Sequence, residues 1–143
     1  MPELVNTKAH RGARNAASIA MADTGAGSAC IKIYTSEGGT LLAVRALAKP
    51  CGAVRELDGR IALTQATADD LVLESGAATY ATWCDAGGTP IASGMVTDAD
   101  GNTGAPGSLT PAPGGVGAFV LDGSGGTQLY EGGIVRLTTA LIG

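Results

Sequence analysis

The hydrophobic and polar positions follow a helical pattern only near the N-terminus. Within residues 12–22 the apolar side chains recur at a spacing that places them roughly on one helical face. High alanine content favours a short helix there, and Gly25 is placed to end it. Residues 1–11 show no periodicity and begin with Pro2, so we expect an extended N-terminal arm over 1–11.

From Ser28 onward the period changes to two. Ile31 and Ile33 alternate with polar neighbours, which predicts a half-buried strand. Glycine-rich turns separate the further strands that the pattern predicts, which cover residues 40–48, 60–65, 77–85, 89–98, 117–121, 127–130 and 134–142. Pro50 has no N–H to donate, so we expect the strand that starts at residue 40 to end before it.

About eight short strands after one N-terminal helix predict an all-β fold. We expect a single β-sandwich or jelly-roll-like domain over residues 12–143. A β-barrel is the alternative, because strand spacing does not separate the two architectures. Residues 104–117 are rich in proline and glycine and predict a long loop, while Gly94 indicates a bulge or a close backbone approach inside its strand.

Composition narrows the class of protein. A chain of 143 residues suits one domain, and 15% charged residues is too few for a highly charged disordered chain. No apolar run approaches the roughly 20 residues of a membrane span, and residues 1–10 lack the apolar stretch of a signal peptide. Because the net charge is -4 and aromatic residues are 3%, nucleic-acid binding is disfavoured.

Charge is unevenly distributed along the chain. Residues 1–60 hold eight basic and five acidic side chains, which gives +3, while residues 61–143 hold one basic and eight acidic, which gives −7. Such asymmetry can orient a protein against a charged partner.

The three cysteines, Cys30, Cys51 and Cys84, form no C-x-x-C motif. Their odd number excludes a fully paired disulfide framework. Two interpretations stay open: three small buried side chains in a reducing compartment, or one bridge with one free thiol.

No motif for catalysis or metal binding is complete. His10 is the single histidine and falls in the expected arm, where nothing holds it as a general base. Asp69 and Asp70 are neighbours, which point to opposite faces of a strand, so a solvated turn is the better interpretation. We expect no enzyme activity.

Two glycine-containing segments resemble ligand loops but depart from them. Residues 98–102 begin like a calcium loop, yet glycine stands fourth instead of sixth and Leu109 occupies the twelfth position, so an Asp–Gly turn is expected. Residues 25–27 lack the third glycine of a nucleotide loop. We therefore expect no cofactor and no metal.

The aromatic side chains suggest sugar binding as one candidate function. Trp83, Tyr80, Tyr34 and Tyr130 are the residue types that stack on sugars, so a carbohydrate-binding adhesion module remains a candidate. Trp83 and Tyr80 are three positions apart and belong on opposite faces of one strand, so they do not make a single platform.

Several segments, taken in order, resemble a known group of proteins. They are ARNAA (13–17), DTGAG (23–27), ACIKIYT (29–35), GTLLA (39–43), GRIAL (59–63) and SGAATYATW (75–83). Over roughly residues 12–98 the chain resembles the small Ala/Gly/Thr-rich structural proteins of the head and tail modules of tailed bacteriophages. The resemblance implies a virion protein made in the bacterial host cytoplasm.

That resemblance sets the functional expectation. We expect a non-enzymatic capsid decoration or cement protein that binds the major capsid protein lattice and itself, as a homo-oligomer for which a trimer is one candidate. Lys8, Arg11 and Arg14 are expected to contact a neighbouring subunit. No nucleic acid, membrane or small-molecule substrate is expected. The alternatives are a head–tail junction or tail component and the carbohydrate-binding module.

Overall fold

The computed structural model describes residues 7–67 and 70–142 and begins with helix α1 (Lys8–Ala22). The side chain of Thr7 caps this helix by accepting a hydrogen bond from the His10 N–H. The helix therefore starts four residues before the predicted boundary, and the prediction of an extended arm is wrong for residues 8–11. The rest of the predicted arm, residues 1–6, lies outside the described residues.

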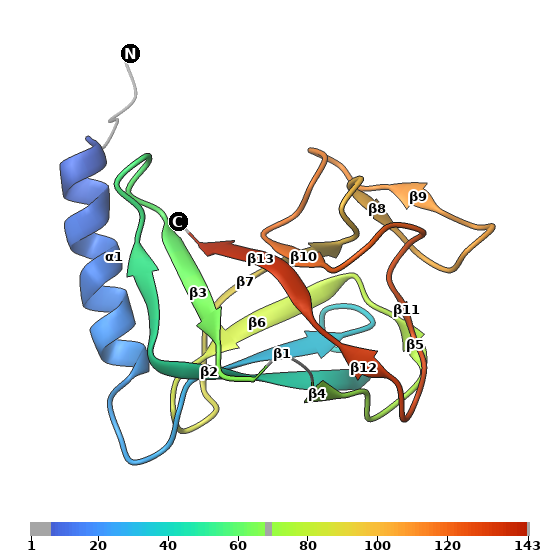
Figure 1. Ribbon diagram of the computed structural model, residues 1–143, viewed down its shortest axis with the longest axis horizontal. Coiled ribbons are helices and arrows are strands. Elements are labelled where there is room, and N and C mark those ends of the chain that lie inside the picture. The colour runs from blue at the N-terminus through green and yellow to red at the C-terminus, as the bar shows by residue number, and fades with distance from the viewer. Residues whose placement is uncertain (1–6, 68–69, 143) are drawn as a thin grey trace.

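The main body is a closed β-barrel (Figure 1). Its strands are ordered β1-β2-β3-β13-β10-β7-β6 around the wall. Their bounds are β1 (Cys30–Tyr34), β2 (Leu41–Val54), β3 (Ile61–Gln65), β6 (Tyr80–Cys84), β7 (Pro90–Thr97), β10 (Phe119–Leu121) and β13 (Leu137–Ile142). Neighbouring strands are antiparallel except β7 and β10, which pair in parallel. The all-β class with a short N-terminal helix is confirmed, and the strands close into the barrel that strand spacing left as the alternative to a sandwich.

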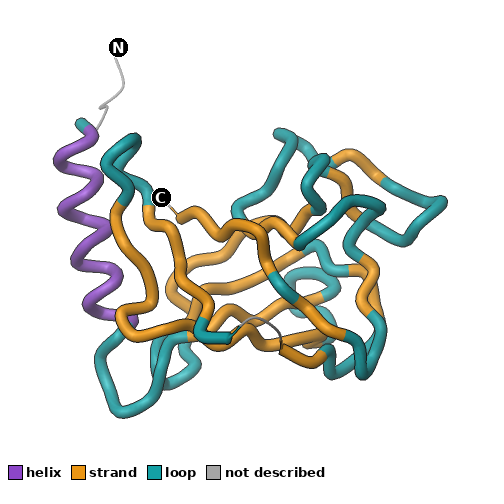
Figure 2. The backbone as a smooth tube through the Cα atoms, in the orientation of Figure 1, coloured by secondary structure: helices purple, strands orange, loops and turns teal. Residues whose placement is uncertain are grey.

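Three short strand pairs extend one side of the barrel, away from α1 (Figures 1 and 2). They are β4 (Asp70–Leu71) with β12 (Ile134–Val135), β5 (Gly76–Ala77) with β11 (Gln128–Leu129), and β8 (Asn102–Thr103) with β9 (Thr110–Pro111). Strand β9 lies inside residues 104–117, the segment predicted to be a long loop, and pairs with β8 just before it. Part of that segment is therefore a strand.

The barrel core follows the alternation of the strands. Ile31 and Ile33 on β1 are fully buried, as the period of two predicted. Trp83 on β6, the ladder partner of Ile31, is buried as well. Phe119 from β10 joins the same cluster. The large apolar side chains thus converge from both halves of the chain into one interior.

Pro50 does not end its strand, which corrects the prediction. Strand β2 continues to Val54, but its pairing with β3 jumps from Leu47 to Gly52, so the residues between them are left out of the ladder. Pro50 is exposed within this bulge, where no N–H is required. Gly52 resumes the ladder, and a Cβ there would lie 2.7 Å from the carbonyl oxygen of Ala62.

Candidate functional site

The side of the barrel opposite α1 carries a cluster of exposed apolar side chains. Leu71, Leu73, Tyr130 and Ile134 have exposed fractions of 64%, 50%, 62% and 59%. Leu71 and Ile134 are direct partners in the antiparallel β4–β12 pair, so their side chains are adjacent on one face. We call these four residues the apolar edge surface.

The local backbone explains why these side chains face solvent. Val72 is 3% exposed and bridges to Ala43, so it takes the inward position between Leu71 and Leu73. The N–H of Val72 donates to the carbonyl of Gly133, and the Gly132 N–H donates to the carbonyl of Val72. The tight turn after Tyr130 is therefore fixed to this strand.

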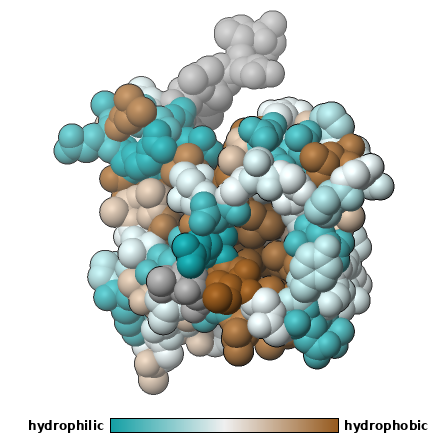
Figure 3. All heavy atoms as spheres, turned by 45° about the vertical axis from the view of Figure 1, so that its right-hand side comes forward, coloured by the Kyte–Doolittle hydropathy of each residue, from teal (hydrophilic) through white to brown (hydrophobic). Residues whose placement is uncertain are grey.

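A groove of about 460 Å³ adjoins the apolar edge surface. Ile134 belongs to both, so the two features are continuous. The other lining residues come from β10, β11, β12, the turns next to them and the β8–β9 turn. The apolar ones are Pro106, Leu121, Leu129 and Val135. Figure 3 shows apolar surface in a hollow of this face, with hydrophilic residues on both sides.

Polar side chains border the groove as well. Asp122 and Arg136 form an ion pair of 3.8 Å between side chains that are more than half exposed. Gln128 lines the groove and donates from Nε2 to the carbonyl of Leu129. An apolar floor with a polar border is typical of a surface that binds another polypeptide.

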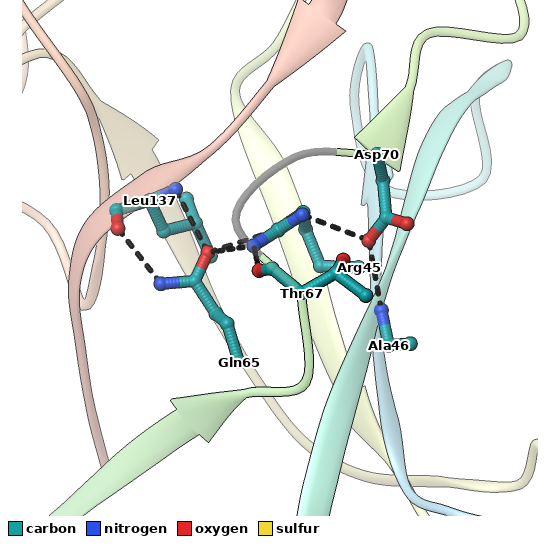
Figure 4. A network of polar contacts seen from close by, with 6 residues as sticks. All are labelled: Arg45, Ala46, Gln65, Thr67, Asp70 and Leu137. Carbon is teal, nitrogen blue, oxygen red and sulfur yellow. Dashed lines mark hydrogen bonds and ion pairs between the residues drawn. The ribbon is translucent and has the colours of Figure 1, made fainter.

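A buried polar network holds β4 in place (Figure 4). Arg45 is fully buried, and its guanidinium donates to Asp70 Oδ2 at 2.9 Å, to Gln65 Oε1 and to the carbonyl of Thr67. Asp70 Oδ2 also accepts from the Ala46 N–H. The prediction of a solvated turn is therefore wrong for Asp70, which belongs to β4 and whose carboxylate is bound to the barrel wall. This contact places Leu71, the next residue, at the edge. Asp69 lies outside the described residues.

Gln65 extends this network to the last strand. Its Nε2 donates to the carbonyl of Leu137, and its Oε1 accepts from the Leu137 N–H. Strands β3 and β13 pair directly only at Ile61 and Ala62. The side-chain amide therefore supplies the hydrogen bonds that a neighbouring strand would otherwise give to Leu137.

The basic residues expected to bind a partner lie on α1 instead of an arm. Lys8 and Arg14 are exposed, whereas Arg11 is half-buried and donates from Nη1 to the carbonyl of Asp58 at 2.6 Å. The structure therefore leaves Lys8 and Arg14 at the surface and uses Arg11 to hold the β2–β3 turn. His10 is exposed on the same helix.

The segment that resembled a calcium loop is a tight turn. Asp98 Oδ1 accepts from the N–H groups of Asp100 and Asn102, and Gly101 adopts a φ of +83°. Although burial raises the pKa of Asp98, hydrogen bonds from backbone N–H groups outweigh it and hold the pKa below its usual value. Within residues 7–67 and 70–142, no three His, Cys, Asp or Glu side chains are placed to hold a metal ion.

The aromatic residues do not gather on one surface. Trp83 is 1% exposed inside the barrel, while the rings of Tyr34 and Tyr80 contact each other with centroids 6.1 Å apart. Tyr130 lies in the apolar edge surface. The prediction that Trp83 and Tyr80 take opposite faces of one strand is confirmed, because Trp83 belongs to the barrel core with its partner Ile31, whereas Tyr80 lies outside that core.

The only sequence signal near the apolar edge surface is the short apolar run of Leu71, Val72 and Leu73. That segment is too short to assign by periodicity, and its partner Ile134 lies in a distant strand.

Comparison with known proteins adds no assignment. No family model, curated protein or solved structure matches this chain. Among the described residues, no helix is both long and apolar enough to cross a membrane.

Proposed function

We propose that this chain is a non-enzymatic structural protein of a tailed-bacteriophage virion, and that it decorates the capsid by binding the major capsid protein lattice. The proposal joins the resemblance over roughly residues 12–98 to one structural observation, the apolar edge surface with its adjoining groove. The protein would be made in the bacterial host cytoplasm and act on the virion.

The apolar edge surface supports a binding role because its exposure is costly in a small protein. Apolar surface removed from water contributes roughly 25 cal/mol per Å². Leu71 and Ile134 are each more than half exposed and adjacent, so one contact covers both. A partner with a complementary apolar surface would gain from that contact.

The arrangement also suits a repeated lattice. One small apolar contact binds weakly, but many copies on one particle, or several within an oligomer, add their contacts through multivalency. Lys8 and Arg14 on the exposed face of α1 offer a second, charged contact on the opposite side of the barrel. Two contact regions on opposite sides allow one copy to bridge two neighbours, which fits a homo-oligomer on capsid subunits.

The test is binding of the recombinant protein to purified capsids that lack it. We expect saturable binding at a fixed ratio of copies to capsid subunits. Replacing Ile134 by Asp, or Leu71 by Asp, should weaken binding at least tenfold, because a carboxylate would then have to be desolvated in the contact.

Val116 provides the matched control. It is 55% exposed in the segment before β10, outside the apolar edge surface, the groove lining and α1, so Val116→Asp adds the same charge without changing either proposed contact. Circular dichroism would check that all three variants fold. Equal binding by Ile134→Asp and Val116→Asp, or no binding by the unmodified protein, would rule out this surface as the capsid contact. A few copies per mature particle would point instead to a head–tail junction or tail component.

A further inference from the structure

Two of the three cysteines face each other across neighbouring strands. Cys30 at the start of β1 and Cys84 at the end of β6 are direct partners in the antiparallel ladder. The next pair, Ile31 and Trp83, is buried in the core, so alternation directs the two thiols to the opposite side of the wall. Each thiol shifts the pKa of the other, so the two side chains are close enough to interact.

The backbone register places the two Cα atoms within the range of separations found in disulfides. The Leu47 N–H donates to the carbonyl of Ala29, so residue 29 directs its backbone groups toward β2. Backbone groups alternate along a strand, so those of Cys30 point toward β6, and Cys30 and Cys84 form a hydrogen-bonded pair. Such pairs have Cα atoms about 5.5 Å apart, which lies within the range of about 4.4–6.8 Å that disulfides span.

The surroundings favour ionisation of one thiol. The hydrogen bond from Cys30 is the main cause that lowers the pKa of Cys84 to about 6, against the opposing effect of burial. Thr82 Oγ1 lies 3.3 Å from the Cys84 sulfur, and the ammonium of Lys32 lowers the pKa of Cys84 further. The thiolate, not the thiol, is the reactive form in exchange with disulfides.

We infer that Cys30 and Cys84 form a dithiol site that a low-molecular-weight disulfide, such as glutathione disulfide, converts into an intramolecular disulfide between β1 and β6. This inference does not depend on the proposed capsid role.

The reaction proceeds by two exchanges. Cys30 is the more accessible sulfur, since it is partly exposed while Cys84 is fully buried. The pKa of Cys30 is raised by its interaction with Cys84, so the Cys84 thiolate acts first as the base and accepts the proton of Cys30. The Cys30 thiolate formed in this way attacks the small disulfide, forms a mixed disulfide and releases one small thiolate. Cys84 then loses its proton and attacks Cys30, which releases the second. The protein loses two electrons and two protons, and the small disulfide becomes two thiols.

Cys51 serves as the internal comparison. It belongs to the barrel core, on the other side of the wall from Cys84. Burial, with the nearby carboxylate of Asp23, raises the pKa of Cys51 to about 11. It should therefore stay reduced under conditions that oxidise the Cys30–Cys84 pair.

The test incubates the folded, full-length protein with glutathione disulfide at neutral pH and follows the intact mass. We expect the loss of two hydrogen atoms and no lasting glutathione adduct. Trypsin places the three cysteines in separate peptides, because cleavage sites follow Arg14, Lys32, Arg45, Arg55, Arg60 and Arg136. A linked pair that joins residues 15–32 to residues 61–136 would support the inference.

Variants separate the site from a general thiol reaction. With glutathione disulfide, the Cys51→Ser protein should still lose two hydrogen atoms, whereas the Cys30→Ser protein should not. Oxidation should also raise the Tm of the Cys51→Ser protein by several degrees. Cys30 is partly exposed, so its replacement leaves the core intact and the result does not depend on a Cys84 variant that fails to fold. A stable glutathione adduct on Cys30, a link that includes Cys51, or no reaction of the folded protein would each overturn the inference.

Discussion

The carboxylate of Asp98 accepts a hydrogen bond of 2.8 Å from the backbone N–H of Gly126, although 28 residues separate them in the chain. Its other oxygen accepts from the N–H groups of Asp100 and Asn102, each at 2.9 Å. One side chain at the end of β7 therefore organises its own turn and attaches the loop before β11. Gly126 lines the groove, so Asp98 also helps to fix the shape of the candidate binding surface.

Replacing Asp98 by Asn should destabilise the protein by about 2–3 kcal/mol. The amide would present a donor where the carboxylate accepts, and hydrogen bonds to charged groups contribute about 1.5–3 kcal/mol. Urea denaturation measures the change, with Asp100→Asn as the control because Asp100 is exposed. If both variants unfolded at the same urea concentration, the contacts of Asp98 would not be stabilising.

The same carboxylate makes stability depend on pH. The pKa of Asp98 is lower in the folded protein than in the unfolded chain, so its contribution is present above the unfolded value of about 3.9 and is lost as pH falls through the folded pKa. We expect the Tm gap between the unmodified protein and Asp98→Asn to be widest above about pH 5 and to shrink under acid. A gap that stayed constant down to the lowest pH at which the protein folds would contradict this assignment.

Gln65→Met should lower the free energy of unfolding by about 2–4 kcal/mol. The substitution removes the partners of both backbone groups of Leu137 and one partner of the buried Arg45. Gln65→Glu should be milder, since it keeps an acceptor for Arg45 and for the Leu137 N–H and loses only the donor to the Leu137 carbonyl. Urea midpoints of the two variants measure the difference. A more damaging Gln65→Glu would show that burial of the added charge outweighs the bond to Arg45.

Local patterns predicted the elements of this fold better than their assembly. Ile31 and Ile33 revealed their strand because alternate burial leaves a period of two in the sequence. The closure of the barrel left no such trace. It depends on the parallel pairing of Phe119 with Val96, a contact between segments far apart in the chain. Strand spacing alone therefore could not separate a barrel from a sandwich.

The departures from the sequence predictions have local causes. Thr7 is a good helix-capping residue, but the missing periodicity of residues 1–11 indicates an arm and hides the first turn of α1. The bulge that takes Pro50 out of the ladder depends on β3, so the local sequence around Pro50 predicts a strand end. No local pattern reveals the apolar edge surface, because Leu71 and Ile134 meet only when β4 pairs with β12.

Gly94 marks a close approach of chains, one of the two alternatives that the sequence offered. The β6–β7 register is regular at this position, and a Cβ on Gly94 would lie 3.0 Å from the Cβ of Ala118. Gly94→Val should therefore destabilise the protein by about 1–3 kcal/mol, as overpacking does. Ser93→Val, at the exposed neighbouring position, should change the urea midpoint little. Equal effects of the two substitutions would show that the wall has room at Gly94.

Helix α1 is held to the barrel at the β2–β3 turn, and Asn15 is a main contact. Its Nδ2 donates to the carbonyl of Gly59 at 2.7 Å, while Arg11 bonds the carbonyl of Asp58. Asn15→Ala should loosen the helix without unfolding the barrel, because the strand ladders do not involve this contact. Hydrogen exchange should therefore become faster in residues 8–22 and stay unchanged in β6 and β7. Ala16→Ser, at an exposed position of the same helix, is the control for altered helix propensity. Faster exchange throughout the barrel after Asn15→Ala would mean that helix and barrel unfold as one cooperative unit.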